Sequence, residues 1–197
     1  MDFNFSEEQT MMSGVLREFL DAECTMGELR KQIAADVPRD EQRWGKLAEM
    51  GLFTVLLPED AGGLGLAEQD FVLLAEAAGY ANLPEALIEH AGVAAPLLAA
   101  LAPDHELVAK AAAGEVTLIA GDPATAYLPN VDSADALLLW DGKSVHLVPA
   151  SAVKAVRQES VDPLRRLFKV TWTPSDATRL GGDNATAWAQ AVNRGTL

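Results

Sequence analysis

Cysteine is nearly absent from this sequence, because Cys24 is the only one in 197 residues. A single thiol excludes an internal disulfide and a metal site built from several cysteines, and it favours a reducing cytoplasm. We expect Cys24 itself to be an inert helix residue. No apolar run approaches the length of a membrane span, so no membrane association is expected. The first six residues hold an aspartate and no lysine or arginine, which argues against a secretory signal.

Basic residues are also scarce. The chain has 15 Lys and Arg against 29 Asp and Glu, which gives a net charge of −14. Such a chain repels nucleic-acid phosphates and anionic lipids, so neither is an expected partner. The same charge opposes any anionic ligand unless helix N-termini or local cations compensate. We favour the simpler interpretation that the acidic side chains cover solvated helix faces and keep the protein soluble.

The first 113 residues have a helical pattern. Ser6, Thr25 and Asp40 each precede a stretch of helically spaced apolar residues and can serve as N-caps. Later helices are expected at 69–80, 85–101 and 104–113. Pro96 lies inside the longest of them and should kink or split it. These later helices are rich in Ala and Leu nearly all round, which is typical of helices buried by several neighbours.

The pattern changes at Gly114, after which short strands are expected at 116–119, 136–140, 144–148, 152–157 and 167–172. Asp141-Gly142 predicts a hairpin turn between two of them. The predicted fold class is α+β. It comprises an all-α domain over residues 1–114, a small antiparallel β domain over 115–182, and the start of a truncated helical domain over 183–197.

Residues 51–80 contain the most informative motif. An apolar run ends at Pro58 and Glu59, and three glycines follow within four positions, at Gly62, Gly63 and Gly65. A phosphate-binding Walker loop would need a lysine and a hydroxyl residue, and a dinucleotide fingerprint would need a preceding strand. Glycine is also used where φ is positive or where backbones approach closely. We therefore favour an architectural turn over a ligand cradle.

This loop and the opening Asp2-Phe3-Asn4-Phe5-Ser6-Glu7-Glu8-Gln9 together resemble the N-terminal part of the acyl-CoA dehydrogenase family. The resemblance covers almost all of the chain and implies the same order of helical and β domains, followed in the family by a C-terminal bundle. The implied activity is the α,β-dehydrogenation of an acyl-CoA thioester by FAD, an oxidoreductase reaction of fatty acid or steroid degradation. The family's catalytic base lies in the C-terminal bundle, so no residue of this chain is assigned that role.

The same resemblance implies positions for cofactor and substrate. Gly121 and Asp122 match the family's Thr-Glu-Pro segment, and Tyr127, Leu128 and Pro129 match its Trp-Ile-Thr segment, so these five are the candidate FAD-binding residues. Gly121 and Pro129 replace hydroxyl residues of the family, whereas Tyr127 keeps an aromatic ring that could stack. The candidate acyl-CoA contacts, in the region of the family's substrate pocket, are Leu87, His90 and Ala91.

Other charged residues allow two interpretations each. Arg165 and Arg166 could meet a ligand phosphate or a partner's carboxylate, or form a salt bridge within the β domain, for instance with Asp162. Glu85 and Glu89 could form a carboxylate dyad, although solvated acids are far commoner. The three histidines have no spacing suited to a metal, so no metal site is expected.

Three hypotheses about function remain open. The chain is part of a flavin-dependent acyl-CoA dehydrogenase and is incomplete alone, or it is a non-catalytic subunit of that family that pairs with a catalytic chain. In either case we expect a homo- or hetero-oligomer with another acyl-CoA dehydrogenase-like chain. A third possibility is a remnant of a longer protein.

Overall fold

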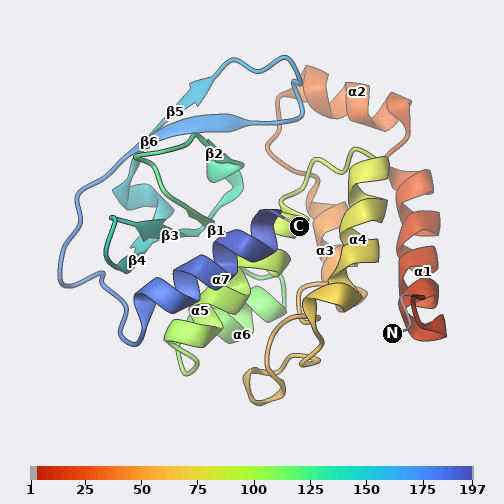
Figure 1. Ribbon diagram of the computed structural model, residues 1–197. Helices are drawn as coiled ribbons and strands as arrows, with labels where there is room; N and C mark the ends of the chain where they lie inside the picture. Colours follow the sequence, from red (N-terminus) through yellow and green to blue (C-terminus); the bar gives the residue numbers. More distant parts are fainter. Residues whose placement is uncertain (1–3, 197) are drawn as a thin grey trace.

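The computed structural model describes residues 4–196 and contains a helical half and a β half (Figure 1). The α-helices are α1 (Glu7–Glu23), α2 (Met26–Ala35), α3 (Glu41–Glu49), α4 (Glu68–Tyr80), α5 (Ala95–Leu101), α6 (Glu106–Ala112) and α7 (Asn184–Thr196). The strands are β1 (Leu118–Gly121), β2 (Leu128–Pro129), β3 (Ala136–Trp140), β4 (Val145–Pro149), β5 (Lys154–Gln158) and β6 (Leu167–Thr171). The α+β fold class is thereby confirmed.

The three predicted N-caps are confirmed. The Ser6 hydroxyl accepts from the backbone N–H of Gln9, and the Gln9 side chain accepts from the backbone N–H of Ser6 at 2.7 Å. The Thr25 hydroxyl caps α2 by accepting from the N–H of Glu28. The Asp40 carboxylate caps α3 by accepting two backbone N–H groups. Local hydrogen bonds of this kind satisfy donors that the first turn of a helix leaves free.

The helix expected at 85–101 is divided, as Pro96 suggested. A π-helical segment, η2 (Ile88–Ala94), comes first, and α5 follows with Pro96 in its first turn. Pro96 has no N–H to donate, so it cannot continue the backbone hydrogen bonds of the helical segment, and the change from π-helical to α-helical geometry falls directly before it. The helix starts later than predicted. Glu85 lies outside it, where its side chain accepts from the backbone N–H of Asp40.

The β half consists of two three-stranded sheets, with strand orders β1-β3-β4 and β2-β6-β5. All neighbouring strands are antiparallel except β1 and β3, which run parallel, so the first sheet is mixed. The predicted hairpin at Asp141-Gly142 joins β3 to β4, and Asp141 accepts backbone N–H groups of Lys143 and Ser144. Sequence patterns did not predict β2, which is only two residues long.

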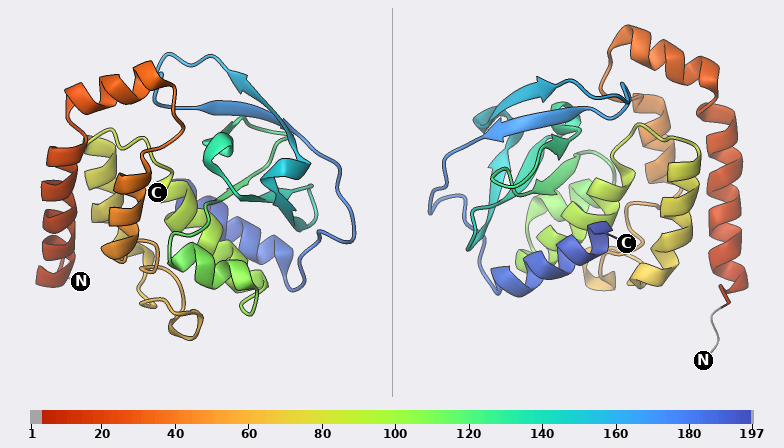
Figure 2. Two further views of the ribbon diagram at one scale, coloured as in Figure 1. Left: turned by 180° about the vertical axis from the view of Figure 1, so that it is seen from behind. Right: turned by 45° about the horizontal axis from the view of Figure 1, so that its top comes forward.

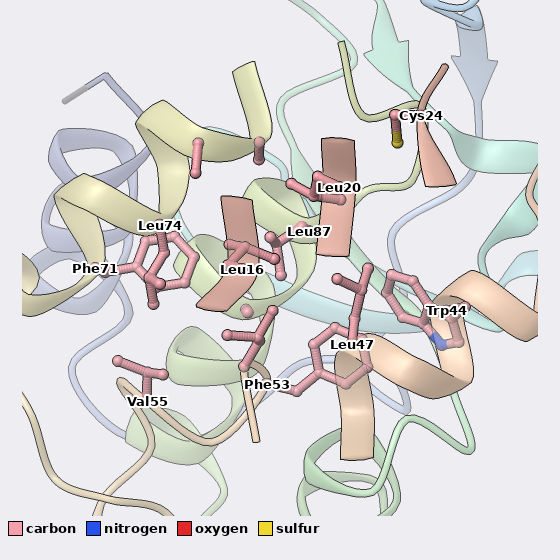
Figure 3. Packing of buried hydrophobic residues seen from close by; sticks show 14 of the residues in the cluster. Leu16, Leu20, Cys24, Trp44, Leu47, Phe53, Val55, Phe71, Leu74 and Leu87 are labelled. Carbon is pink, nitrogen blue, oxygen red and sulfur yellow. The ribbon is translucent and has the colours of Figure 1, made fainter. Parts of the chain in front are cut away.

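A first hydrophobic cluster fills the space between α1, α3, α4 and the segment leading into η2 (Figure 3). Leu16, Leu47, Phe53 and Leu74 are at most 1% exposed. Burial of each such side chain stabilises the fold by about 1.5–3 kcal/mol. Cys24 lies at the edge of this cluster, and desolvation raises the pKa of its thiol to about 11. The thiol is therefore protonated and unreactive at neutral pH.

A second cluster joins α5, α6 and α7 to β1 and β3. Helix α7 lies along α5 and η2, and both views of Figure 2 show it beside them. The stacked rings of Trp140 and Trp188, 5.4 Å between centroids, tie this helix to the first sheet. The domain boundaries at 114 and 182 remain predictions, and this cluster contains residues from both sides of each. No helix in the described part of the chain is long and apolar enough to cross a membrane.

Candidate functional site

The glycine loop uses its own backbone groups. The N–H of Gly63 donates to the Pro58 carbonyl, and the N–H of Gly65 donates to the Leu57 carbonyl at 2.8 Å. A Cβ atom at Gly63 would lie 2.0 Å from the Leu57 oxygen, and Gly62 has a φ of 79°. These glycines are therefore required by the turn, which supports the architectural interpretation.

Glu85 and Arg43 form a buried ion pair beneath the segment that leads into η2. Both side chains are at most 3% exposed, and the guanidinium Nε and Nη2 atoms each lie 2.7 Å from a carboxylate oxygen. Arg43 also donates to the Glu23 carbonyl and to the Gln32 side chain. Because every charge is matched, this cluster is a structural feature, and Glu85 forms no dyad with Glu89.

His90 lies in the core, with no exposed surface. The backbone N–H of Leu118 donates to its Nδ1 at 3.0 Å, and Nε2 lies 3.1 Å from the Ala111 carbonyl. Its ring packs edge-on against Phe53 and Trp44. Burial lowers the pKa of His90 to about 4, so the ring is neutral. The histidine holds β1 against the helical half and is not accessible to a ligand in this conformation.

A cavity of about 220 Å³ lies between the end of α4, the segment leading into η2, the end of β2 and the β5–β6 loop. Its wall includes Leu83, Leu87, Ile88, Glu89, Pro129, Asn130, Leu164 and Arg165. The cavity therefore lies where the helical and β halves meet. It is called the junction cavity below.

Two polar side chains, Glu89 and Asn130, line this cavity. Glu89 is half-buried, and burial raises the pKa of its carboxyl more than the hydrogen bond from its own backbone N–H and the nearby Arg165 charge lower it. Asn130 is 7% exposed, and its Oδ1 has no hydrogen-bond partner among the described residues. Native proteins satisfy most buried polar atoms, so exceptions of this kind require an explanation.

Some of the residues that the sequence predicted to bind substrate or cofactor line the junction cavity, and others lie in the hydrophobic core. Leu87 and Pro129, from the expected substrate and cofactor regions, line the junction cavity together. His90 and Ala91 lie behind this wall in the core, at most 1% exposed. Sequence reasoning did not assign Ile88 or Leu164 to the site, because neither residue type nor spacing distinguishes them from core residues.

The remaining cofactor candidates are engaged within the fold. A Cβ atom at Gly121 would lie 2.0 Å from a methyl carbon of Leu128, so these two residues pack directly against each other. The Asp122 carboxylate accepts from the backbone N–H of Ala124. Tyr127 is 54% exposed and offers a free ring face. The five candidates thus present one aromatic ring and one proline, and they present no hydroxyl group other than that of the tyrosine.

The two neighbouring arginines differ. Arg166 pairs with Asp132 and with Asp36, at the C-terminal end of α2, so the salt-bridge interpretation holds for it. Asp36 also pairs with Arg157 of β5 at 2.5 Å. These ion pairs connect α2 to the β half. Arg165 is exposed at the rim of the junction cavity and has no ion pair within residues 4–196.

Within residues 4–196, no three His, Cys, Asp or Glu side chains are grouped closely enough to hold a metal ion. A second hollow, of about 390 Å³, runs between α4, η2 and the end of α7. Leu56, Phe71, Val72 and Ile88 make it largely apolar. Arg194 borders it, pairs with Glu68 at 3.0 Å, and has a buried Nη1 atom without a partner among the described residues.

The arrangement of a helical half packed on two small sheets defines a mixed helical and β protein with a cavity at the junction. The family model described as "Acyl-CoA dehydrogenase, N-terminal domain" matches residues 6–111, more than half of the sequence. The chain therefore belongs to the acyl-CoA dehydrogenase family, as the sequence motifs indicated.

A curated protein resembles the chain at low sequence identity. It is 27% identical over 166 residues to acyl-CoA dehydrogenase IpdE2 of Mycobacterium tuberculosis, a match that covers 83% of this chain and 51% of that relative. The chain thus spans about half the length of this curated relative.

Solved structures share its fold. The ChsE4–ChsE5 complex of Mycobacterium tuberculosis matches with a TM-score of 0.82 at 22% identity, over 100% of this chain and 61% of that one. An acyl-CoA dehydrogenase of Bacillus anthracis complexed with FAD matches with a TM-score of 0.77 at 16% identity, over 98% and 40% of the two chains.

Proposed function

We propose that this chain is one subunit of a flavin-dependent acyl-CoA dehydrogenase and that the junction cavity receives part of the acyl group. The observation that carries this proposal is that Leu87 and Pro129, from the expected substrate and cofactor regions, border one cavity. Leu83, Ile88 and Leu164 give the cavity an apolar lining suited to acyl carbons. The buried Arg43–Glu85 pair beneath it fixes the position of this wall.

The five cofactor candidates fit FAD poorly. Tyr127 could stack on an aromatic ring system, but Gly121 and Leu128 pack on each other and Asp122 caps a turn. FAD would supply the oxidation in such an enzyme. We derive no catalytic step for these residues, and we propose that most hydrogen bonds to the flavin come from a second chain of the same family. In this assignment the present chain binds and orients the acyl group and excludes water from it.

The apolar hollow between α4, η2 and α7 supports the existence of such a second chain. Phe71 and Val72 line it, and the unpartnered Nη1 of Arg194 offers a donor at its edge. A helix with an apolar face and a carboxylate near Arg194 would satisfy both requirements. The ChsE4–ChsE5 structure, which shares this fold, is a complex of two chains.

A non-catalytic scaffold is the second candidate. The poor fit of Gly121, Asp122 and Leu128 to a flavin favours it, because a chain that has lost its cofactor contacts can keep the packing that a partner requires. In that case acyl-CoA binding would reside entirely in the partner.

Flavin absorbance separates these candidates. The chain is purified alone and after co-expression with a full-length acyl-CoA dehydrogenase-like chain of the same organism. FAD is added, and acyl-CoA oxidation is followed with an electron-accepting dye. We expect no stable flavin with the chain alone, and flavin together with dehydrogenation in the complex.

Full activity of the chain alone would refute the subunit assignment. A complex whose activity equals that of the other chain by itself would favour the scaffold. Arg194→Ala tests the hollow, and Arg179→Ala is the matched control because, among the described residues, Arg179 forms an ion pair only with Asp176 at the surface. Only the first substitution should weaken assembly.

A further inference from the structure

The junction cavity is not uniformly apolar. Glu89 and Asn130 line it from different halves of the molecule, because one comes from η2 in the helical half and the other follows β2 in the β half. A cavity that received only hydrocarbon would gain nothing from these two polar groups, since desolvation of each costs free energy.

Glu89 is the more informative of the two. No side chain within residues 4–196 hydrogen-bonds or ion-pairs with its carboxyl, which accepts from its own backbone N–H, whereas Glu85, four residues earlier, is matched by Arg43. Burial favours the protonated form of Glu89, and a neutral carboxyl both donates and accepts a hydrogen bond. The group is therefore suited to bind a hydroxyl or carbonyl oxygen.

Asn130 complements this group. Rotation of its amide by half a turn exchanges Oδ1 and Nδ2, so the amide can offer an acceptor or a donor to the cavity. Its backbone φ of 52° is left-handed and is fixed on both sides: its N–H donates to the Arg166 carbonyl, and its carbonyl accepts from the Ser133 hydroxyl. The side chain is thus held at the cavity by a rigid turn.

The charges around the cavity define its polarity. Glu85 is neutralised by Arg43, and Asp162, at the rim, accepts from the backbone N–H of Leu164. Arg165 is the cation of this rim within the described residues. An anionic end of a ligand would meet Arg165 at the entrance.

We infer that the junction cavity selects an oxygenated acyl group, which carries a hydroxyl or carbonyl oxygen that Glu89 and Asn130 bind, over a plain hydrocarbon chain. This inference rests on the proposed function, because it specifies the acyl group that the same cavity would receive. Glu89 is then a specificity residue. The oxygen of the ligand would meet the Glu89 carboxyl and the Asn130 amide, whose Oδ1 has no partner among the described residues.

Two probes test this inference on the chain alone, without flavin or a second chain. They are 5-hydroxyhexanoate and hexanoate, which share the carboxylate for Arg165 and differ in one hydroxyl. Binding is followed by calorimetry and by shifts of the backbone amide signals of Glu89 and Asn130. We expect 5-hydroxyhexanoate to bind roughly tenfold more tightly, the effect of a well-formed hydrogen bond in a desolvated site.

Substitutions separate specificity from folding. Glu89→Leu should abolish or invert the preference by strengthening hexanoate binding, a gain that an unfolded variant cannot show. Asn130→Gly, which tolerates a positive φ, should reduce the preference. Arg165→Gln should weaken both probes equally. Glu18→Leu, on the exposed face of α1, is the matched control and should change neither.

Three results would overturn the inference: equal binding of the two probes, an unchanged preference in Glu89→Leu, or no binding of either probe at the cavity amides. These outcomes are independent of the test of the proposed function. A clear hydroxyl preference in a chain that never supports dehydrogenation would leave the cavity assignment in place and refute the enzymatic role.

Discussion

The segment 85–90 has an inner side and a cavity side, and the two are organised differently. On the inner side, Glu85, which also borders the junction cavity, is matched by Arg43, and both ring nitrogens of His90 are engaged by the backbone. On the cavity side, Glu89 is half-buried, and its carboxyl accepts from its own backbone N–H but has no side-chain partner within residues 4–196. Residues one turn apart thus serve the fold in one case and remain available to a ligand in the other.

This difference shows how to distinguish structural from functional polar residues. Removing the partner of a fully matched buried charge costs several kcal/mol of stability, on the order of 3–5 kcal/mol. Such a charge has no free hydrogen-bonding group for a ligand. A buried carboxyl that is unmatched costs stability, and such a cost is common at binding sites.

The largest effect is expected for Glu85→Ala. It leaves the Arg43 guanidinium buried without its partner, and breaking a buried pair in this way costs about 3–5 kcal/mol of unfolding free energy. Urea denaturation measures this loss. The double substitution Arg43→Met with Glu85→Leu should cost less than Glu85→Ala alone. A single-variant loss below about 1 kcal/mol would contradict the structural role of the pair.

The next effect is the pH dependence that His90 imposes. Its folded pKa of about 4 lies below the ordinary value of 6.5, so only the unfolded chain takes up this proton in that interval. Stability should therefore fall as the pH decreases from 6.5 to 4, by about 3 kcal/mol in all. His90→Gln should remove this dependence in denaturation curves, whereas His105→Gln, at the half-buried N-cap of α6, should retain it. If His90→Gln kept the wild-type dependence of stability on pH, the low folded pKa of His90 would be refuted.

Sequence patterns predicted the parts of this fold that local interactions determine. Ser6, Thr25 and Asp40 cap their helices through hydrogen bonds to residues two or three positions away, and Asp141 forms its hairpin in the same way. The pairing of Arg43 with Glu85 spans 42 positions and has no local signature. Strand β2 is too short to show periodicity.

The candidate site was predictable to a smaller extent. The acyl contacts expected at Leu87, His90 and Ala91 remain predictions. Because the helix is apolar nearly all round, its pattern could not tell which of these residues would border a cavity. Leu87 reaches the junction cavity, whereas His90 and Ala91 point into the core. The π-helical geometry of η2 further shifts the faces from those of a regular α-helix. The roles of the FAD candidates remain predictions.

On the cavity side, Glu89→Gln should stabilise the protein. Burial raises the folded pKa of Glu89, so the folded chain holds this proton more tightly and wild-type stability falls as the pH rises above the ordinary value of 4.5. The variant should gain about 1 kcal/mol at neutral pH and almost nothing at pH 4. Paired denaturation curves at the two pH values measure this difference. Equal gains at both would show that Glu89 does not titrate as described.

The smallest effect is expected at the ion pairs that connect α2 to the β half. Asp36 accepts from Arg157 and Arg166 at the surface, and exposed ion pairs contribute little and are screened by salt. Asp36→Asn keeps a residue that tolerates the φ of 50° and should lower the melting temperature slightly, at low salt only. A large loss that persists in high salt would indicate that this connection to α2 determines the stability of the junction.

The protonation of Glu89 tests the account most directly. The carboxyl carbon signal of Glu89 can be followed by NMR as the pH is changed. The account predicts that Glu89 titrates clearly above the ordinary 4.5 of a glutamate and that bound 5-hydroxyhexanoate perturbs its signal. Titration at or below that value, as for a carboxylate matched by a cation, would contradict the difference between the two sides of the segment.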